Sequence, residues 1–142
     1  MLKLSPHQFG TIFDTLRATG SSRGSEKRQA TRMDVQTKLS LAKMVDGNVV
    51  RCYSALSRDI SCTGLGFFQF APLANGERFL CCFPFGKEEL VLVCSSMFCR
   101  PLAEGLFGIG AQFECAADQK LIDQLKQQRA TDVDRIRASI LT

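Results

Sequence analysis

Histidine is almost absent from this chain, since His7 is the only one among its 142 residues. A Ser-His-Asp arrangement or a Cys/His metal site needs histidine, and no Cys-x-x-Cys pair makes up for the shortage. The sequence therefore argues against a metal site and offers no catalytic constellation that would predict an enzyme. The seven cysteines are an odd, scattered set, as expected for free thiols packed as small apolar groups in a reducing cytoplasm.

Long apolar runs are also lacking. No stretch approaches the roughly 18 apolar residues of a membrane span, and the first residues lack the apolar segment of a signal peptide. The length suits one domain, and a content of 45% hydrophobic and 23% charged residues is ordinary for a globular protein. The net charge of +4 permits an anionic partner without requiring one. We expect a cytoplasmic protein with neither a membrane span nor DNA as a partner.

Residues 1–18 carry the start signals of an amphipathic helix over residues 5–18. Ser5 is placed to cap it, Pro6 suits the first helical position, and Gln8 completes a capping box. An apolar stripe at helical spacing follows: Phe9, Ile12, Phe13 and Leu16. The stripe has two open interpretations, packing on the body of this protein or docking on a partner. Residues 19–27, rich in Gly and Ser, predict a flexible linker.

Six β-strands are predicted between residues 28 and 116. They are separated by turn signals such as Asp46-Gly47-Asn48 and Asn75-Gly76. The expected strands run over residues 35–41, 49–56, 65–70, 78–83, 90–100 and 106–113. Short strands at this spacing favour a mainly β fold, a closed six-stranded antiparallel barrel without exposed edges. Residues 117–142 predict either one helix beginning after Asp118 or two helices, the second capped by Thr131 or Asp134.

Two short motifs stand out beside these strands. The first is an Arg-x-x-x-Arg run, Arg28 and Arg32, just before the first strand. The second is an Asp-x-Ser-x-x-Gly run made of Asp59, Ser61 and Gly64, between the second and third strands. Asp and Ser side chains can fix a turn through nearby backbone N–H groups. The two motifs, in this order on a six-strand pattern, resemble the signature of the PilZ domain family over residues of about 26–115.

The resemblance implies a six-stranded barrel that binds the bacterial second messenger cyclic di-GMP, with no cofactor. Its chemistry agrees with the motifs, because an arginine fork matches the O6/N7 edge of guanine and also grips phosphate. Asp59 could accept hydrogen bonds from the guanine N1–H and N2–H₂ groups, Ser61 could hold the turn or the ligand, and Gly64 could give the backbone room. The weaker candidates for ligand contacts are Lys27, Arg58, Arg100 and Gly110.

The sequence therefore predicts a non-enzymatic receptor that binds cyclic di-GMP and signals to an unidentified protein partner. Ligand-induced ordering of the linker at residues 19–27 would carry the signal. The alternatives are a PilZ-like interaction scaffold that binds no ligand and a small flavin-binding barrel enzyme. The number of bound nucleotides is open, and so is the choice between a monomer and a homodimer.

Overall fold

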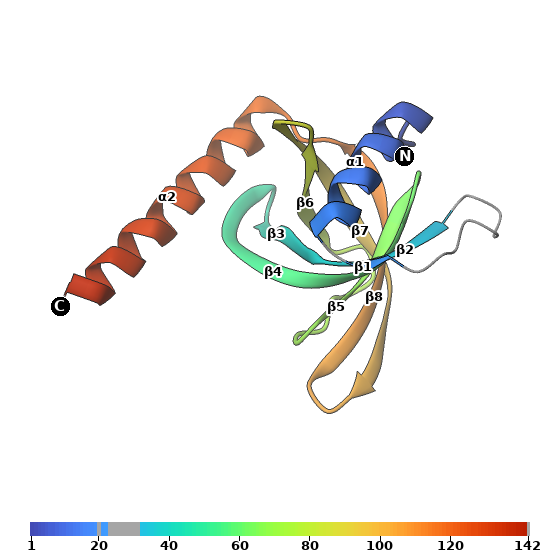
Figure 1. The fold of residues 1–142 in the computed structure, drawn as a ribbon. Coiled ribbons are helices and arrows are strands. Elements are labelled where there is room, and N and C mark those ends of the chain that lie inside the picture. The colour runs from blue at the N-terminus through green and yellow to red at the C-terminus, as the bar shows by residue number, and fades with distance from the viewer. Residues whose placement is uncertain (20, 23–31, 142) are drawn as a thin grey trace.

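The protein is described here by a computed structural model that covers residues 1–19, 21–22 and 32–141. Two helices flank a β-barrel in it (Figure 1). The helices are α1 (Pro6–Thr19) and α2 (Gln119–Leu141). The strands are β1 (Ser21–Ser22), β2 (Arg32–Gln36), β3 (Lys38–Val45), β4 (Asn48–Ser61), β5 (Gly64–Gln69), β6 (Arg78–Phe85), β7 (Glu88–Ala103) and β8 (Leu106–Ala116).

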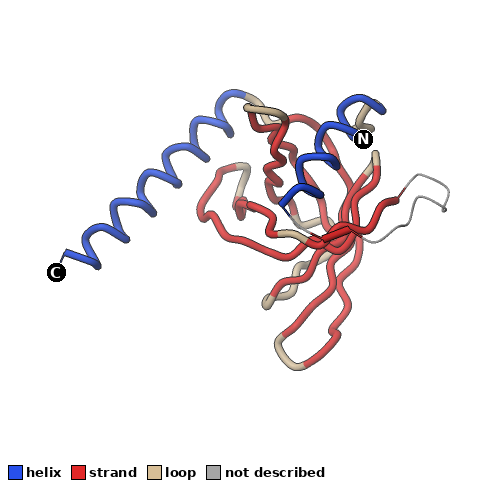
Figure 2. Tube along the Cα trace, viewed as in Figure 1, coloured by secondary structure: helices blue, strands red, loops and turns tan. Residues whose placement is uncertain are grey.

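The barrel is closed by six antiparallel strands in the order β4-β3-β6-β7-β8-β5, and β5 pairs back with β4. This confirms the predicted six-stranded fold. β2 adds to β4, and β1 adds to β2, so the strands continue beyond the closed ring (Figure 2). The predicted first strand is divided into β2 and β3 at Thr37, whose N–H donates to Ser57 Oγ at 2.9 Å.

Most turns follow their local sequence signals. Asp46 and Gly47 join β3 to β4 with φ angles of 52° and 77°, the left-handed geometry that two-residue hairpin loops require. Part of the predicted linker is regular, because Thr19 ends α1 and Ser21–Ser22 pair with β2. Residues 20 and 23–31 lie outside the described part of the chain.

Aromatic side chains fill the barrel. Phe67 meets Phe79, and Phe83 meets Phe113, each edge to face with ring centroids 5.5 and 5.8 Å apart. All four rings are fully buried. Each contributes a large apolar area to the core, and the edge-to-face geometry adds about 0.5–1.5 kcal/mol for each pair. The alternating pattern of the strands thus points one residue set inward and leaves the other set on the outer surface.

Helix α1 covers one end of this core. Ser5 N–H donates to Gln8 Oε1 at 3.0 Å, and Gln8 N–H donates to Ser5 Oγ at 3.1 Å, which confirms the capping box. Three residues of the stripe are buried in the core, namely Ile12, Phe13 and Leu16, and Phe9 packs beside them. The stripe therefore packs on the protein's own barrel, and the interpretation as a docking face is wrong for this structure.

Helix α2 is one continuous helix, which settles the choice between one helix and two. Leu121 N–H donates to Asp118 Oδ1 at 2.9 Å, so Asp118 caps the helix as expected. Thr131 caps nothing, because its hydroxyl donates back to Gln127 O at 3.0 Å within the helix. Leu121 and Leu125 pack on the barrel, Arg129 bonds to Glu89 of β7, and α2 beyond Arg129 projects away from the barrel (Figure 1). Neither described helix is long and apolar enough to cross a membrane.

Candidate functional site

The two sequence motifs meet because β2 pairs with β4. Arg32 lies opposite Ser61, and Asp34 lies opposite Asp59, in antiparallel register. Opposite residues of an antiparallel pair have Cα atoms about 4.5–5.5 Å apart. The second arginine of the Arg-x-x-x-Arg run therefore starts its strand directly beside the Asp-x-Ser-x-x-Gly turn. The other candidates from this run, Lys27 and Arg28, lie outside the described residues.

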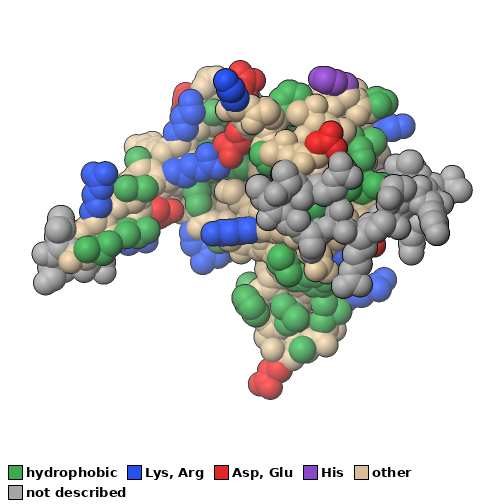
Figure 3. Space-filling model, in the orientation of Figure 1, with side chains coloured by type: hydrophobic (Ala, Val, Ile, Leu, Met, Phe, Trp, Pro, Cys, Tyr) green, Lys and Arg blue, Asp and Glu red, His purple; other side chains and the backbone are tan. Residues whose placement is uncertain are grey.

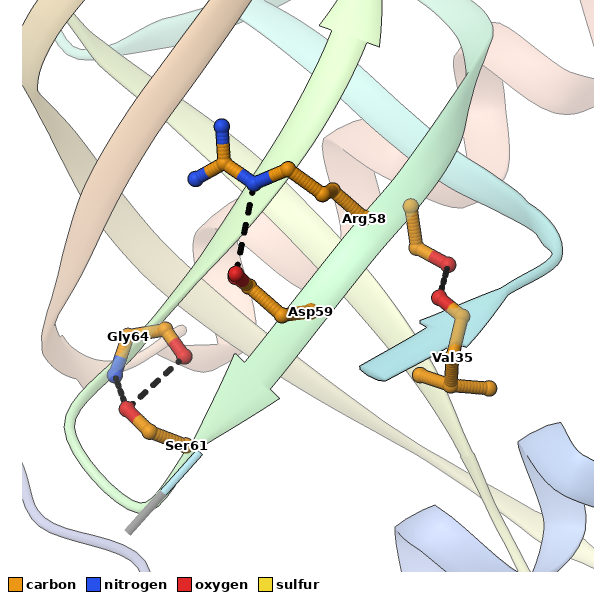
Figure 4. A network of polar contacts seen from close by, with 6 residues as sticks. Val35, Arg58, Asp59, Ser61 and Gly64 are labelled. Carbon is orange, nitrogen blue, oxygen red and sulfur yellow. Dashed lines mark hydrogen bonds and ion pairs between the residues drawn. The ribbon is translucent and has the colours of Figure 1, made fainter. Parts of the chain in front are cut away.

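A buried serine fixes β2 in this position. Ser57 Oγ donates to Val35 O (Figure 4) and accepts from Thr37 N–H at 2.9 Å, so a single hydroxyl joins the end of β2 to β4. Ser57 N–H also donates to Thr37 O at 2.8 Å. Ser57 does not stand out in the sequence, since no local pattern shows that a serine will bridge strands 20 residues apart.

Asp59 is the most enclosed charged residue of the site, with 7% of its surface exposed. Arg58 Nε donates to Asp59 Oδ2 at 3.2 Å (Figure 4). Neighbours in a strand normally point to opposite faces, but the register of β4 against β5 shifts between Ser57 and Asp59. This bulge places both side chains on the outer face. The hydrogen bond from the guanidinium orients the carboxylate on this face.

Ser61 holds the turn between β4 and β5. Its Oγ accepts from Thr63 N–H at 3.2 Å and from Gly64 N–H at 3.1 Å, and it donates to Gly64 O at 3.2 Å (Figure 4). Ser61 is buried, so these bonds satisfy backbone groups that water does not reach. The structure thus gives Ser61 a definite local role, whereas the sequence left open whether it holds the turn or the ligand.

Strand pairing in the barrel requires a glycine at position 64. A Cβ at this position would lie 2.1 Å from the backbone oxygen of Ala111 in β8. A glycine here lets β5 and β8 pair closely and so closes the barrel beside the turn. Gly66, two residues on, differs, because a Cβ there would meet the side chains of Arg58 at 2.2 Å and Asp59 at 2.7 Å.

Glycines form a flat strip across the outer face. Gly66 pairs with Gly110, and Gly110 pairs with Phe98, so the row that begins at Asp59 continues over β5, β8 and β7. The ring of Phe98 covers Gly110, where a Cβ would lie 2.1 Å from it. The Phe98 ring at Gly110 and the Arg58 guanidinium at Gly66 therefore lie directly against the sheet backbone.

Two arginines stack on aromatic rings at this strip. The guanidinium carbon of Arg58 is 6.0 Å from the Phe68 ring centroid, and that of Arg100 is 5.0 Å from the Phe98 centroid. Both distances fit cation–π contacts. Arg58 and Arg100 were weak candidates from the sequence, and the structure brings them to the same outer face as Asp59. Phe68 and Phe98 were not identified from the sequence.

A hollow of about 330 Å³ opens between the turn and this strip. Its lining includes Thr63 and Gly64 from the turn, Gly110 from β8, and Phe98 from β7, together with Met1. The N-terminal residues are tied to the same place, because Leu4 N–H donates to Cys62 O at 2.7 Å. The space is of the size that small-molecule sites have in proteins.

The buried thiols lie away from this face, Cys81 and Cys94 inside the barrel and Cys82 in the apolar cluster under α2. Burial raises the pKa of the Cys81 and Cys94 thiols well above their ordinary value. Burial also raises the pKa of Cys82 to about 12. These cysteines therefore stay protonated near neutral pH and serve as apolar packing groups rather than nucleophiles.

Comparison with known proteins identifies the family of this chain. Residues 26–128 match the family described as the PilZ domain, so the chain belongs to the PilZ domain family. A solved structure of the Bacillus subtilis inhibitor of motility (MotI/DgrA) is similar at 16% identity and a TM-score of 0.44. The similarity covers 76% of this chain and 52% of that one, so this chain spans about half the length of that protein. No curated protein matches the chain significantly.

Proposed function

We propose that this protein is a non-enzymatic receptor for cyclic di-GMP, bound on the outer face around Asp59 and the turn at Ser61–Gly64. The observation that supports this most is the register of β2 on β4, which sets Arg32 opposite Ser61. The register brings the start of β2 next to the turn, and the turn residues Thr63 and Gly64 line a hollow of about 330 Å³. Membership of the PilZ domain family points to the same ligand.

The chemistry of the face suits a guanine nucleotide. The Asp59 carboxylate accepts from the guanine N1–H and N2–H₂ groups, a pair of donors that adenine lacks. Arg32 and Arg28 supply charge for the two phosphodiester groups and forks for the O6/N7 edge. The ring of Phe98, which is 37% exposed, offers a surface on which a base can stack.

Substitution at the motifs tests the proposal. Arg32→Ala and Asp59→Ala should each remove a charge-assisted hydrogen bond to the ligand, which contributes about 1.5–3 kcal/mol. The dissociation constant for cyclic di-GMP should rise about 10- to 150-fold for each variant, since about 1.4 kcal/mol is tenfold. Arg51→Ala is the matched control, because Arg51 is an exposed arginine that stacks on Tyr53, remote from the turn.

Three results are decisive. Loss of affinity in the two site variants, with Arg51→Ala unchanged, supports the proposed site. Equal binding by all the variants would show that the ligand lies elsewhere. If the folded wild-type chain binds no cyclic di-GMP, then the receptor proposal is wrong, and the interaction scaffold becomes the better account.

The same proposal includes a route by which ligand binding is passed on to a partner protein. The bond from Leu4 N–H to Cys62 O joins the segment before α1 to the ligand turn, and a bond of 3.1 Å from Leu2 N–H to Phe113 O joins it to β8. Ligand binding at the turn would therefore affect the position of the N-terminal segment as well as that of the linker before Arg32. Limited trypsin digestion tests the linker route at Arg23, Lys27 and Arg28. Cleavage should slow at saturating cyclic di-GMP, and unchanged rates would exclude ordering of the linker as the switch.

A further inference from the structure

The second half of α2 has a different setting from the first. Leu121 and Leu125 pack on the barrel, and Arg129 donates from Nη1 and Nη2 to the Glu89 carboxylate at 2.8 and 2.9 Å. Beyond Arg129, every side chain described from 130 to 140 is exposed except that of Asp132. The PilZ domain match also ends at residue 128. Residues 130–141, which we call the α2 tail, thus lie outside the family domain.

Three apolar side chains share one side of the α2 tail. Val133 is 47% exposed, Ile136 is 60% exposed and Ile140 is 75% exposed. Their spacing of three and four residues is that of a helix–helix seam. The apolar side chains on the projecting end of α2 are visible in Figure 3. Single exposed apolar residues are common, but a stripe of them on a projecting helix marks an interaction surface.

The tail also needs support as a helix. In proteins most of the stability of a helix comes from packing of its apolar face rather than from the helix propensity of its residues. The α2 tail contains Thr131, Val133 and two aspartates, all of which favour the helix less than Ala or Leu. Packing of the stripe against another helix would supply the stabilisation that the tail's own sequence does not.

We propose that the α2 tail binds the α2 tail of a second copy of this chain, with the two helices antiparallel. In this arrangement the charges of one tail are complementary to the charges of the other. Asp132 and Asp134 precede Arg135 and Arg137, so reversal of one helix sets the acidic half of each tail beside the basic half of the other. Residues three apart share a side of a helix, so Asp134 and Arg137 lie to one side of the stripe and Asp132 and Arg135 to the other, with Arg137 and Asp132 next to the stripe.

The position of the barrel on α2 also favours an antiparallel partner helix. Ile136 lies 11 residues, about three turns, after Leu125 and so on nearly the same side of α2. The stripe therefore continues the face that packs on the barrel. A parallel partner helix would run along that face into the barrel, whereas an antiparallel one leads away from it and places the two barrels at opposite ends. With Val133 opposite Ile136 of the other copy, each contact occurs twice about a two-fold axis.

Sedimentation of the full chain over a wide concentration range tests the proposal. The interface is smaller than the roughly 1,200–2,000 Å² of stable complexes, so the mass should rise from one chain to two as concentration increases. Ile136→Asp should abolish the rise. Phe70→Asp is the control, because Phe70 is 85% exposed in a separate part of the surface and should leave dimerisation unchanged. A wild-type chain that stays monomeric throughout, or an Ile136→Asp variant that still dimerises, would overturn the proposal.

Charge variants test the partner's identity. A chain with Asp132→Arg and Asp134→Arg should not self-associate, and neither should a chain with Arg135→Asp and Arg137→Asp. Mixing the two should restore dimers, because one tail is then basic and the other acidic. Failure of the mixture to dimerise would contradict tail–tail pairing. Small-angle scattering of the wild-type dimer should show an elongated particle with a barrel at each end, and a compact particle would contradict the antiparallel direction.

Discussion

Gly64→Ala is expected to destabilise the fold even without ligand. The new Cβ would lie 2.1 Å from Ala111 O, a backbone atom of the paired strand β8. β5 and β8 would have to separate by about 1 Å, and strain of this kind costs about 1–3 kcal/mol, occasionally more. The overlap is severe and the contact is backbone, so we take about 3 kcal/mol. For a domain of this size the melting temperature should fall by about 10 °C.

Gly66→Ala is the matched comparison. Its Cβ would lie 2.2 Å from Nη2 of Arg58 and 2.7 Å from Oδ1 of Asp59, which are side-chain ends that can rotate away. Arg58 is partly exposed, so loss of its contact with Asp59 costs about 0–1 kcal/mol. The stability should change by about 1 kcal/mol or less. Cyclic di-GMP binding should nevertheless weaken, because the substitution displaces the carboxylate that we assign to guanine.

Urea unfolding and ligand titration of the two variants separate these effects. The expected result is a lower unfolding midpoint for Gly64→Ala, and near-normal stability with reduced affinity for Gly66→Ala. Equal midpoints for Gly64→Ala and the wild type would refute the reasoning from the β5–β8 contact. Unchanged affinity in Gly66→Ala would contradict the assignment of Asp59 to the ligand.

Three further results are expected. The free energy of unfolding should fall as pH rises from 9 towards about 12, because burial holds the pKa of Cys82 at about 12 in the folded chain, whereas the same thiol ionises at its ordinary pKa of 9.0 in the unfolded chain. Each such group lowers the stability by about 1.4 kcal/mol per pH unit in this range. A urea unfolding midpoint that does not change over this range would contradict the prediction. Ser61→Ala should cost about 1–3 kcal/mol by leaving the Gly64 N–H without its acceptor, measured by urea unfolding. Asp118→Ala should cost about 1 kcal/mol by removing the cap of α2, measured by thermal unfolding.

Local signals in the sequence predicted local structure well. The capping box at Ser5 and Gln8, the cap at Asp118 and the turn at Asp46-Gly47 depend on residues no more than three apart. The alternating strands predicted the closed barrel, because the period of the apolar residues decides which face is buried. Thr131 shows the limit, because its hydroxyl can cap a new helix or bond back within an existing one.

The arrangement of the site was harder to predict from the sequence. Arg58 reaches Asp59 only because of the bulge after Ser57, and strict alternation would have placed the two side chains on opposite faces. The contact that requires a glycine at position 64 comes from Ala111, which is far away in sequence. From the sequence Gly64 was expected only to give the backbone room beside a ligand, not to lie against the backbone of β8. Phe68 and Phe98 escaped notice because aromatic residues in strands usually point into the core.

A calorimetric titration of the ligand-free chain with cyclic di-GMP, and in parallel with cyclic di-AMP, tests the central claim most directly. We expect heat and a defined stoichiometry with cyclic di-GMP. Binding of cyclic di-AMP should be much weaker, because adenine offers Asp59 no N1–H donor and offers the arginines no O6 acceptor. No binding of cyclic di-GMP, or equal binding of the two nucleotides, would contradict a receptor that reads guanine through Asp59 and the arginines beside it.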